Sequence, residues 1–146
     1  MKKITHLTTR GILLMATAAI LLFYFSSCAR KISFQTSSVV PAAEGKVKLT
    51  KDGNKNYKIK ISIANLAEPE RLQPAKKAYV VWMQTADNGT KNIGQINSST
   101  GILSGKLTAG FETVTAFKPV KIFITAEDDA SIQYPGMEVV LSTNNF

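Results

Sequence analysis

The chain has 146 residues, with 18 lysines and arginines against 10 acids, and its formal net charge is +8. Its one histidine, His6, and its one cysteine, Cys28, both precede residue 29, so the rest of the chain has no imidazole and no thiol. Residues 29–146 therefore lack the groups that the usual zinc sites, Ser-His-Asp or Cys-His catalysis and disulfide bonds require.

The first 27 residues have the pattern of a secretory signal peptide. A positive head is followed by an uncharged apolar stretch over 11–25, which is shorter than the roughly 20 apolar residues of a membrane-spanning helix. Ser26 and Ser27 come directly before Cys28. This stretch resembles a bacterial lipoprotein signal of the Bacteroidota type, with Phe25 where leucine is usual. The resemblance implies a signal peptide over 1–27 and a lipid on Cys28.

Two other interpretations of the N-terminus stay open. The apolar stretch could remain as an uncut signal anchor, or cleavage could follow Ala29, because Ser27 and Ala29 also fit a small-x-small site. The residues after Cys28 are Ala29, Arg30 and Lys31, without the acidic residues of known sorting signals. By resemblance to those signals, we expect an outer-membrane lipoprotein that faces the periplasm.

Residues 28–43 mix serine, threonine, proline and alanine, which predicts a lipidated cysteine and a flexible tether, with an edge strand at 32–35. From residue 44 to 146 we expect a β-sandwich domain. Apolar and polar residues alternate over 45–49 and 57–63, and Asp52-Gly53-Asn54 between them predicts a hairpin turn. Only an odd loop, 52–54 or 51–55, keeps both apolar sets on one face, and a three-residue loop favours a left-handed glycine.

The remaining elements are also mostly strands. Residues 67–77 contain two prolines and predict a loop or a short helical turn, and 78–85 is apolar on both faces, which predicts a central buried strand. Turns are expected at 98–101 and at Ala109-Gly110, and a long loop over 128–136. Further strands are predicted at 93–96, 102–108, 111–117, 120–127 and 137–143. The pattern predicts an all-β, antiparallel, immunoglobulin-like β-sandwich of about seven to eight strands behind an N-terminal signal helix.

The predicted hairpin carries a row of basic residues. Its outward positions include Lys46, Lys48, Lys58 and Lys60. They could bind phospholipid headgroups, lipopolysaccharide or an acidic partner. They could equally form a solvated strand face on which lysines oppose edge-to-edge aggregation.

Other candidate residues favour structural roles. Glu127, Asp128 and Asp129 form the acidic cluster of the chain, but they supply too few ligands for a cation such as calcium, so we expect a plain turn. Trp82 could stack on a ligand, although a buried strand favours a core residue. Tyr134 is expected at an exposed loop tip, where it could serve recognition.

Residues 78–143 resemble the periplasmic C-terminal domain of anti-sigma-K factors. The resemblance implies the fold and an envelope-side sensing or interaction role. The sequence shows no counterpart of that family's cytoplasmic sigma-binding domain or membrane helix, so sigma inhibition does not carry over. The matching positions are Tyr79, Trp82, Gly94, Thr125, Glu127, Pro135, Gly136, Val140 and Leu141.

These patterns predict a non-enzymatic, lipid-anchored periplasmic binding or sensing module, with no catalytic residue, metal or cofactor. We expect it to contact the membrane through the lipid on Cys28 and to bind an envelope protein or glycan, but no nucleic acid. The alternative is a binder of anionic lipid or glycan through the lysines of the hairpin. A carboxylate-based glycan hydrolase is least favoured, because no pair of acids is placed about 5–10 Å apart by the pattern.

Overall fold

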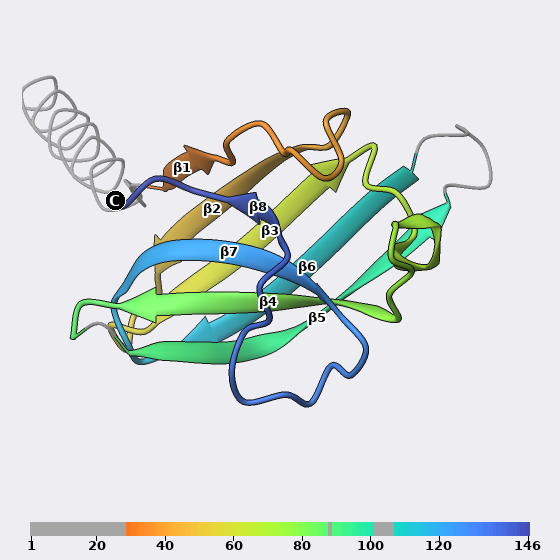
Figure 1. Cartoon of the computed structure of the whole chain (residues 1–146). Helices are drawn as coiled ribbons and strands as arrows, with labels where there is room; N and C mark the ends of the chain where they lie inside the picture. The colour runs from red at the N-terminus through yellow and green to blue at the C-terminus, as the bar shows by residue number, and fades with distance from the viewer. Residues whose placement is uncertain (1–28, 88, 101–106) are drawn as a thin grey trace, which may run out of the picture.

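The structure is a computed structural model, and it describes residues 29–87, 89–100 and 107–146 (Figure 1). Within these residues the chain forms eight strands and one short 3-10 turn, η2 (Pro69–Arg71). The strands are β1 (Arg30–Ser33), β2 (Glu44–Lys51), β3 (Tyr57–Ala64), β4 (Ala78–Thr85), β5 (Thr90–Thr100), β6 (Leu107–Thr115), β7 (Pro119–Glu127) and β8 (Val139–Ser142).

The strands form two antiparallel sheets that pack face to face. One sheet has the order β1-β2-β3-β6 and the other has the order β5-β4-β7-β8. The β3–β4 and β6–β7 connections cross between the sheets, so β3 pairs with β6 while β4 pairs with β7. This interlocking of neighbours is the arrangement of an immunoglobulin-like Greek key. The predicted all-β sandwich is confirmed; the predicted signal helix lies outside the described residues.

The sandwich is closed along both sides. The long strand β5 pairs with β4 through Ile96 and with β6 from Asn97 onward, so it passes from one sheet to the other. On the opposite side, Phe34 and Thr143 form a bridge that joins the end of β1 to the end of β8. Closure leaves few unpaired backbone groups at the sheet edges.

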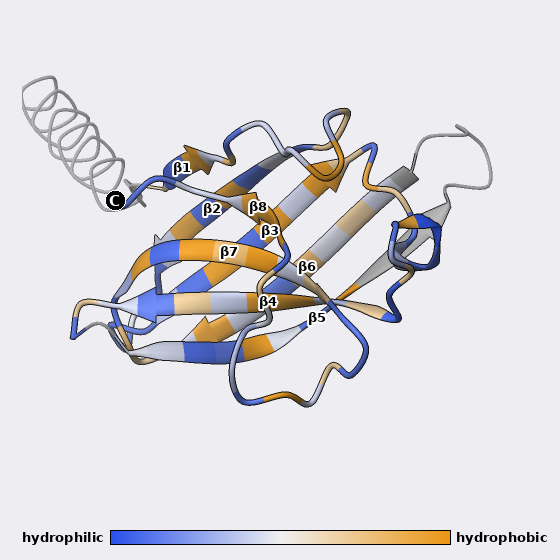
Figure 2. Cartoon of the chain, viewed as in Figure 1, coloured by the Kyte–Doolittle hydropathy of each residue, from blue (hydrophilic) through white to orange (hydrophobic). Residues whose placement is uncertain are grey.

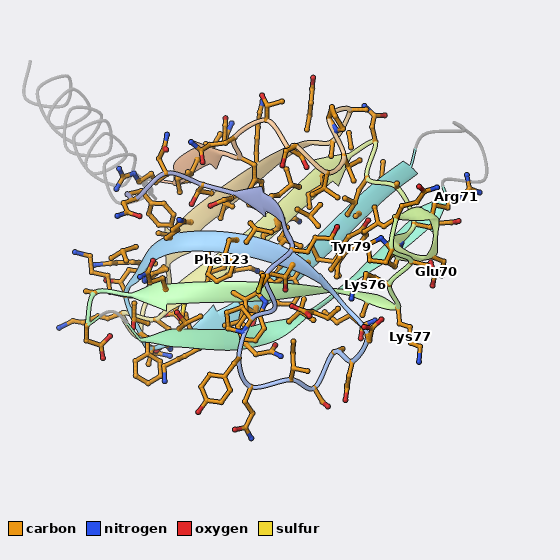
Figure 3. The ribbon with its side chains drawn as sticks, in the orientation of Figure 1. Glu70, Arg71, Lys76, Lys77, Tyr79 and Phe123 are labelled. Carbon is orange, nitrogen blue, oxygen red and sulfur yellow. The ribbon has the colours of Figure 1, made fainter. Side chains whose placement is uncertain are left out.

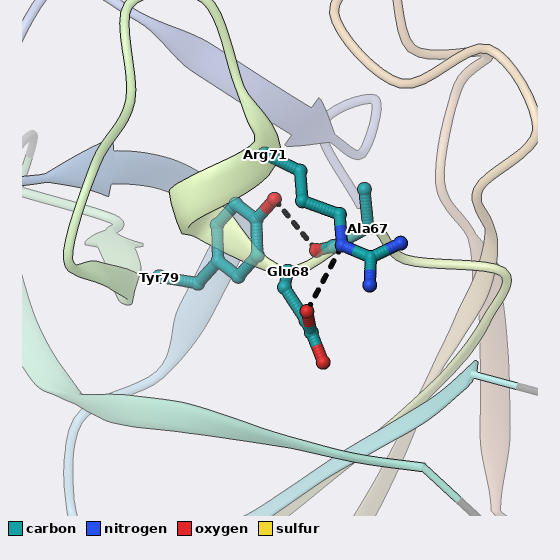
Figure 4. Close-up of polar contacts among 4 residues, drawn as sticks. All are labelled: Ala67, Glu68, Arg71 and Tyr79. Atoms are coloured by element: carbon teal, nitrogen blue, oxygen red, sulfur yellow. Dashed lines mark hydrogen bonds and ion pairs between the residues drawn. The ribbon is translucent and has the colours of Figure 1, made fainter.

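Apolar side chains on the facing surfaces of the two sheets form the core. Figure 2 shows that apolar residues recur along β3, β4 and β7. Each fully buried aliphatic side chain contributes about 1.5–3 kcal/mol relative to exposure. Tyr79 is wholly buried there, and its hydroxyl donates to the carbonyl of Ala67 at 2.9 Å (Figure 4). Burial raises the pKa of Tyr79 to about 12. The best-buried core residues include Val47, Ile59, Ile61, Tyr79, Val81, Met83, Ile122, Ile124 and Leu141.

The loop of the β2–β3 hairpin has an odd number of residues, as expected, but it lies at a different position in the chain. Leu49 lies opposite Ile59, and the Asp52 amide donates to the Asn56 carbonyl, so the loop is 53–55. The predicted loops over 52–54 and 51–55 are therefore wrong by position. Lys55, with φ of 67°, takes the left-handed conformation expected of Gly53. The carboxylate of Asp52 accepts the amide hydrogens of Asn54 and Asn56, which fixes the loop at this position.

Residues 30–43 belong to the sandwich, and the prediction of a flexible tether does not hold for them. β1 pairs with β2 over Arg30–Ser33, two residues before the predicted strand, and Val40 and Ala43 are buried in the core. The prediction failed because small and polar residues dominate this segment, while its few apolar side chains cover one end of the core. Cys28 lies outside the described residues.

Two predicted turns are also strand in the structure. β5 runs through 97–100, and β6 runs without a break through Ala109 and Gly110, which lie opposite Ile63 and Ser62 of β3. Backbone pairing with β3 over the whole length of β6 outweighs the weak strand preference of glycine. Residues 102–106 of the predicted strand lie outside the described residues.

Candidate functional site

The lysines predicted to project outward lie together on the outer face of the β1-β2-β3-β6 sheet. Lys46 and Lys48 on β2 and Lys58 and Lys60 on β3 are all exposed. Lys48 lies opposite Lys60 on one side and opposite Lys31 of β1 on the other. The sequence analysis missed Lys31 because that residue was assigned to the tether. We call Lys31, Lys46, Lys48, Lys58 and Lys60 the lysine face.

Two acids lie on the same side of the sheet as the lysine face, Glu44 at the start of β2 and Glu112 on β6, and Glu112 contacts its lysines. Glu112 on β6 forms ion pairs with Lys58 at 2.5 Å and with Lys60 at 3.5 Å. Among the described residues, neither Lys46 nor Lys48 has an acidic partner within 4.0 Å. The hydrogen bond from Lys58, helped by the charges of Lys58 and Lys60, holds the pKa of Glu112 below its ordinary value of 4.5. The lysine face is therefore partly neutralised at its β3–β6 side and positive at its β1–β2 side.

We expect Glu112→Gln to lower the melting temperature at neutral pH and to have no such effect in acid. Because the folded-state pKa of Glu112 is depressed, its contribution is present above the unfolded value and is lost as pH falls through the folded value. Thermal unfolding of wild type and Glu112→Gln from about pH 7 to about pH 2 measures this, since glutamates titrate in that interval. A difference in melting temperature that persists at the lowest pH would contradict the assignment.

A groove of about 940 Å³ adjoins the lysine face. It lies where β1, the loop before β2 and the ends of β3 and β6 meet. Lys46 and Glu44 line it together with small side chains, among them Ser33, Ser62 and Ala64. Small side chains leave space on an otherwise filled sheet surface, so a polar ligand could lie against the backbone here.

The loop over 128–138, between β7 and β8, lies across the outer face of the other sheet, and we call it the strap (Figure 1). The side-chain amide of Asn92 on β5 donates to the carbonyls of Ala130 and Ile132, both at 2.9 Å. These bonds hold the strap against β5, and the strap accounts for the predicted burial of 78–85 on both faces.

Trp82 lies on this outer face of β4 and is nevertheless wholly buried. Its ring stacks on Phe123 of β7 with 6.3 Å between centroids, and its Nε1 donates to Oγ1 of Thr125 at 2.7 Å. The prediction that Trp82 is a core residue is confirmed. Its environment is a second small core on the outer face of the sheet, separate from the main core between the sheets.

Glu127 ties the far part of the strap to β7. Its side chain is buried, and Oε1 accepts the backbone N–H of Gly136 at 2.8 Å. A Cβ on residue 136 would lie 2.6 Å from Oε2 of Glu127, so any larger residue here would force this carboxylate to move. The second contact of the same region is the Ala126 amide, which donates to the Glu138 carbonyl at 3.2 Å.

The acidic cluster does not converge on one point. Glu127 accepts from Gly136, Asp128 pairs with Nζ of Lys76 at 2.9 Å, and Asp129 accepts the N–H and hydroxyl of Ser131, each at 2.8 Å. Within the described ranges, no group of three His, Cys, Asp or Glu residues could hold a metal ion. The contacts agree with the expected turn.

We expect Glu127→Ala to destabilise the fold by about 1 kcal/mol, because it leaves the half-buried Gly136 amide without its acceptor. Glu127→Gln keeps an acceptor oxygen and serves as the matched control, with a smaller loss. Chemical denaturation and hydrogen exchange of the Gly136 amide measure both effects. Equal exchange rates in Glu127→Ala and wild type would contradict the role of Glu127.

Large apolar side chains are exposed on the strap. Tyr134 is 82% exposed and Met137 is 101% exposed, and Val139 at the start of β8 is 41% exposed. The exposure of Tyr134 agrees with the sequence-based expectation, whereas Met137 was missed, because it was predicted to begin the strand over 137–143, which starts at Val139 in the structure. The strap thus combines a fastened backbone with outward apolar side chains.

Several of the positions quoted for the resemblance lie in or beside the strap region, whereas Tyr79, Val140 and Leu141 belong to the main core. Trp82 and Thr125 bond beneath the strap, Glu127 and Gly136 fasten it, and Gly94 lies at the β-bulge between β4 and β5. In this chain Thr125, Glu127 and Gly136 therefore have structural roles. The sequence spacing alone did not indicate that these residues touch.

Among the described residues, no helix is long and apolar enough to cross a membrane. No family model matches the chain, and neither a curated protein nor a solved structure matches it.

Proposed function

We propose that the chain is a non-enzymatic, lipid-anchored binding or sensing module of the cell envelope, with its lipid on Cys28. In this proposal it sits at the outer membrane, faces the periplasm and binds an envelope protein, as its resemblance to the anti-sigma-K domain implies. The observation that carries the proposal is the strap, which holds Tyr134 and Met137 almost fully in solvent while its backbone is bonded to the sheet. Exposed side chains on a loop that a rigid scaffold positions are typical of binding surfaces.

The chemistry of the described residues supports a binding role over a catalytic one. Residues 29–146 contain no histidine and no cysteine. The carboxylates of the strap region serve local contacts with Gly136, Lys76 and Ser131. General acid–base catalysis needs groups that converge on a substrate, and these three diverge.

The anchor is tested by labelling cells with an alkyne fatty acid and comparing wild type with Cys28→Ala. We expect the label and the outer-membrane fraction to depend on Cys28. Equal labelling of the two proteins would contradict the anchor, and inner-membrane fractionation would contradict the location.

The partner surface is tested by crosslinking in cells, followed by mass spectrometry of the captured proteins. We expect Tyr134→Ser/Met137→Ser to fold normally and to lose the partner captured by wild type, because both side chains are exposed. Val114→Ser, which alters an exposed apolar residue away from the strap, is the control. Retention of the same partner by the double variant would exclude the strap as the contact.

A second function is favoured by the lysine face and its groove. We propose as the alternative that Lys46, Lys48, Lys58 and Lys60 bind an anionic lipid or glycan. The exposure of all four and the lack of an acidic partner for Lys46 and Lys48 among the described residues support it. Binding to lipopolysaccharide should weaken with salt and with Lys46→Gln/Lys48→Gln, while Arg71→Gln/Lys77→Gln should leave it unchanged. Salt-independent binding would reject this alternative.

A further inference from the structure

The sandwich has two chemically different ends, and the chain leaves toward Cys28 from one of them. β1 begins at Arg30, which lies opposite Leu49 near the β2–β3 turn. The β4–β5 and β6–β7 turns lie at the same end, because Thr85 pairs with Pro119. The C-terminal Phe146 is also there, with its amide bonded to Val120 (Figure 1). We call this the proximal end.

The proximal end is rich in bases. Its acids, Asp52 and Asp87, are engaged in hydrogen bonds within their own turns, with Asn54 and Asn56 for Asp52 and with Thr85 for Asp87. The basic residues at this end, on β1, at the strand ends and in the turns, are Arg30, Lys51, Lys55, Lys91 and Lys118.

The opposite end has the reverse composition. The β3–β4 loop and the strap carry Glu68, Glu70, Asp128, Asp129 and Glu138. Bases are present there as well: Arg71 is paired with Glu68 and Lys76 with Asp128, while Lys77 forms no ion pair among the described residues. Figure 3 shows Glu70, Arg71, Lys76 and Lys77 together at this end. The long axis of the sandwich therefore carries a charge gradient that is positive at the proximal end.

Aromatic rings accompany the bases of the proximal end. Nζ of Lys91 lies 4.4 Å from the ring centre of Phe117, which is 51% exposed. Nζ of Lys51 lies 5.1 Å from the ring of Tyr57, and the guanidinium of Arg30 lies 5.7 Å from the ring of Phe146. All cation–ring contacts among the described residues are at this end. Aromatic rings and long basic side chains are the residues that membrane interfaces favour.

The distance to the anchor is short. Cys28 precedes Arg30 by two residues, and two residues span at most about 7 Å. Arg30 itself is held in β1 by pairing with β2. A lipid on Cys28 would therefore bring the proximal end to the headgroups. The connection is too short for the domain to rotate and present its opposite end to the membrane.

Resting on the proposed lipidation of Cys28, we propose that the proximal end is a docking surface for the anionic headgroups of the membrane that holds the anchor. The sandwich then stands upright on the bilayer. Its acidic end points away from the membrane, and the lysine face is turned sideways and is free for other ligands.

The experiment uses the full acylated protein, with acylation checked by mass, in vesicles of phosphatidylcholine alone or with phosphatidylglycerol. Lipidation consumes the Cys28 thiol, and Cys28 is the one cysteine of the chain, so an introduced cysteine carries the only reactive thiol. Ala116→Cys reports on the proximal end, Ser62→Cys on the lysine face and Ala75→Cys on the acidic end, and all three positions are exposed. Each carries a fluorophore that nitroxide headgroups quench.

We expect quenching at position 116 to exceed that at positions 62 and 75 severalfold in phosphatidylglycerol vesicles, and to fall in high salt. Lys51→Gln/Lys55→Gln/Lys118→Gln should reduce it, whereas Lys46→Gln/Lys48→Gln/Lys60→Gln, with the same change of charge, should not. Strongest quenching at position 62 would mean that the lysine face docks, and equal quenching at all three sites would mean a free orientation. Either result, or no dependence on phosphatidylglycerol, would overturn the proposal.

The docking surface can also be tested if Cys28 proves not to be lipidated. If the mass shows no acyl chain, the proposed function fails, and the same full chain is then sedimented with phosphatidylglycerol vesicles. Salt-sensitive binding that is lost in the proximal triple variant would still support the docking surface. Absence of binding, or equal binding by the two triple variants, would count against it.

Discussion

Trp82→Ala is expected to lower the free energy of unfolding by about 3–5 kcal/mol, the cost of emptying a large buried aromatic site. The substitution removes a wholly buried ring, its stack on Phe123 and its hydrogen bond to Thr125. It also leaves the strap over an empty space on the outer face of β4. We therefore expect loss of protection from hydrogen exchange in the strap as well as lower global stability.

Chemical denaturation followed by circular dichroism measures the stability, since Trp82 is the one tryptophan of the chain and its fluorescence disappears in this variant. Trp82→Phe should cost less, because it keeps an aromatic ring against Phe123 and loses the donor to Thr125. Thr125→Val isolates that hydrogen bond at about 1 kcal/mol. A loss below about 1 kcal/mol in Trp82→Ala would contradict a second core beneath the strap.

Gly94→Ala is expected to cost about 2–4 kcal/mol, from backbone strain and overpacking together. Gly94 has φ of +137°, a conformation that side chains rarely adopt. A Cβ here would lie 2.7 Å from Cε2 of Phe111. The glycine follows the β-bulge opposite Val81 and Trp82, and its amide donates to Oδ1 of Asn92 at 3.0 Å.

A double-mutant cycle with Phe111→Leu separates the two causes. The smaller side chain removes the overlap with the new Cβ and leaves the backbone strain. We expect Gly94→Ala to be less costly in the Phe111→Leu background, while still destabilising it. If the two substitutions change the free energy of unfolding additively, the Phe111 ring does not restrict the side chain at position 94. If Gly94→Ala leaves the free energy of unfolding unchanged, the backbone strain inferred from the positive φ is contradicted.

Asn92 links these two regions. Its side-chain nitrogen donates to two carbonyls of the strap, and its side-chain oxygen accepts from Gly94. The bulge that needs Gly94 thus also aims the amide that holds the strap. An asparagine within a short polar stretch has no distinctive sequence signal, and for that reason sequence analysis did not single it out.

The predicted strands were correct where apolar residues alternate with polar ones or form a continuous run. Ala78–Thr85 has the predicted bounds and burial on both faces, and the odd parity of the β2–β3 loop is correct. Local composition misled elsewhere. Gly110 was predicted to lie in a turn and instead pairs with β3, and residues 36–43 were predicted to be a flexible tether, although their apolar side chains cover the core.

The candidate surfaces were also only partly predictable from the sequence. The outward positions of Lys46, Lys48, Lys58 and Lys60 follow from alternation alone, because side chains on a strand change face at every residue. The addition of Lys31 and the neutralising contact of Glu112 depend on which strands are neighbours. The charge gradient between the two ends depends on the same pairing.

By itself, the sequence determined the fold class, the central strand, the side of the sheet on which the lysines lie and the likeness of residues 1–28 to a lipoprotein signal. These features depend on residue type and on spacing within one segment. Only the tertiary structure decided that a strap covers Trp82, that Glu127 holds Gly136 and that bases and rings gather at the end from which the chain leaves toward Cys28. Those features join residues that lie far apart along the chain, and their contacts come from strand order and loop path, which alternation within a strand does not specify.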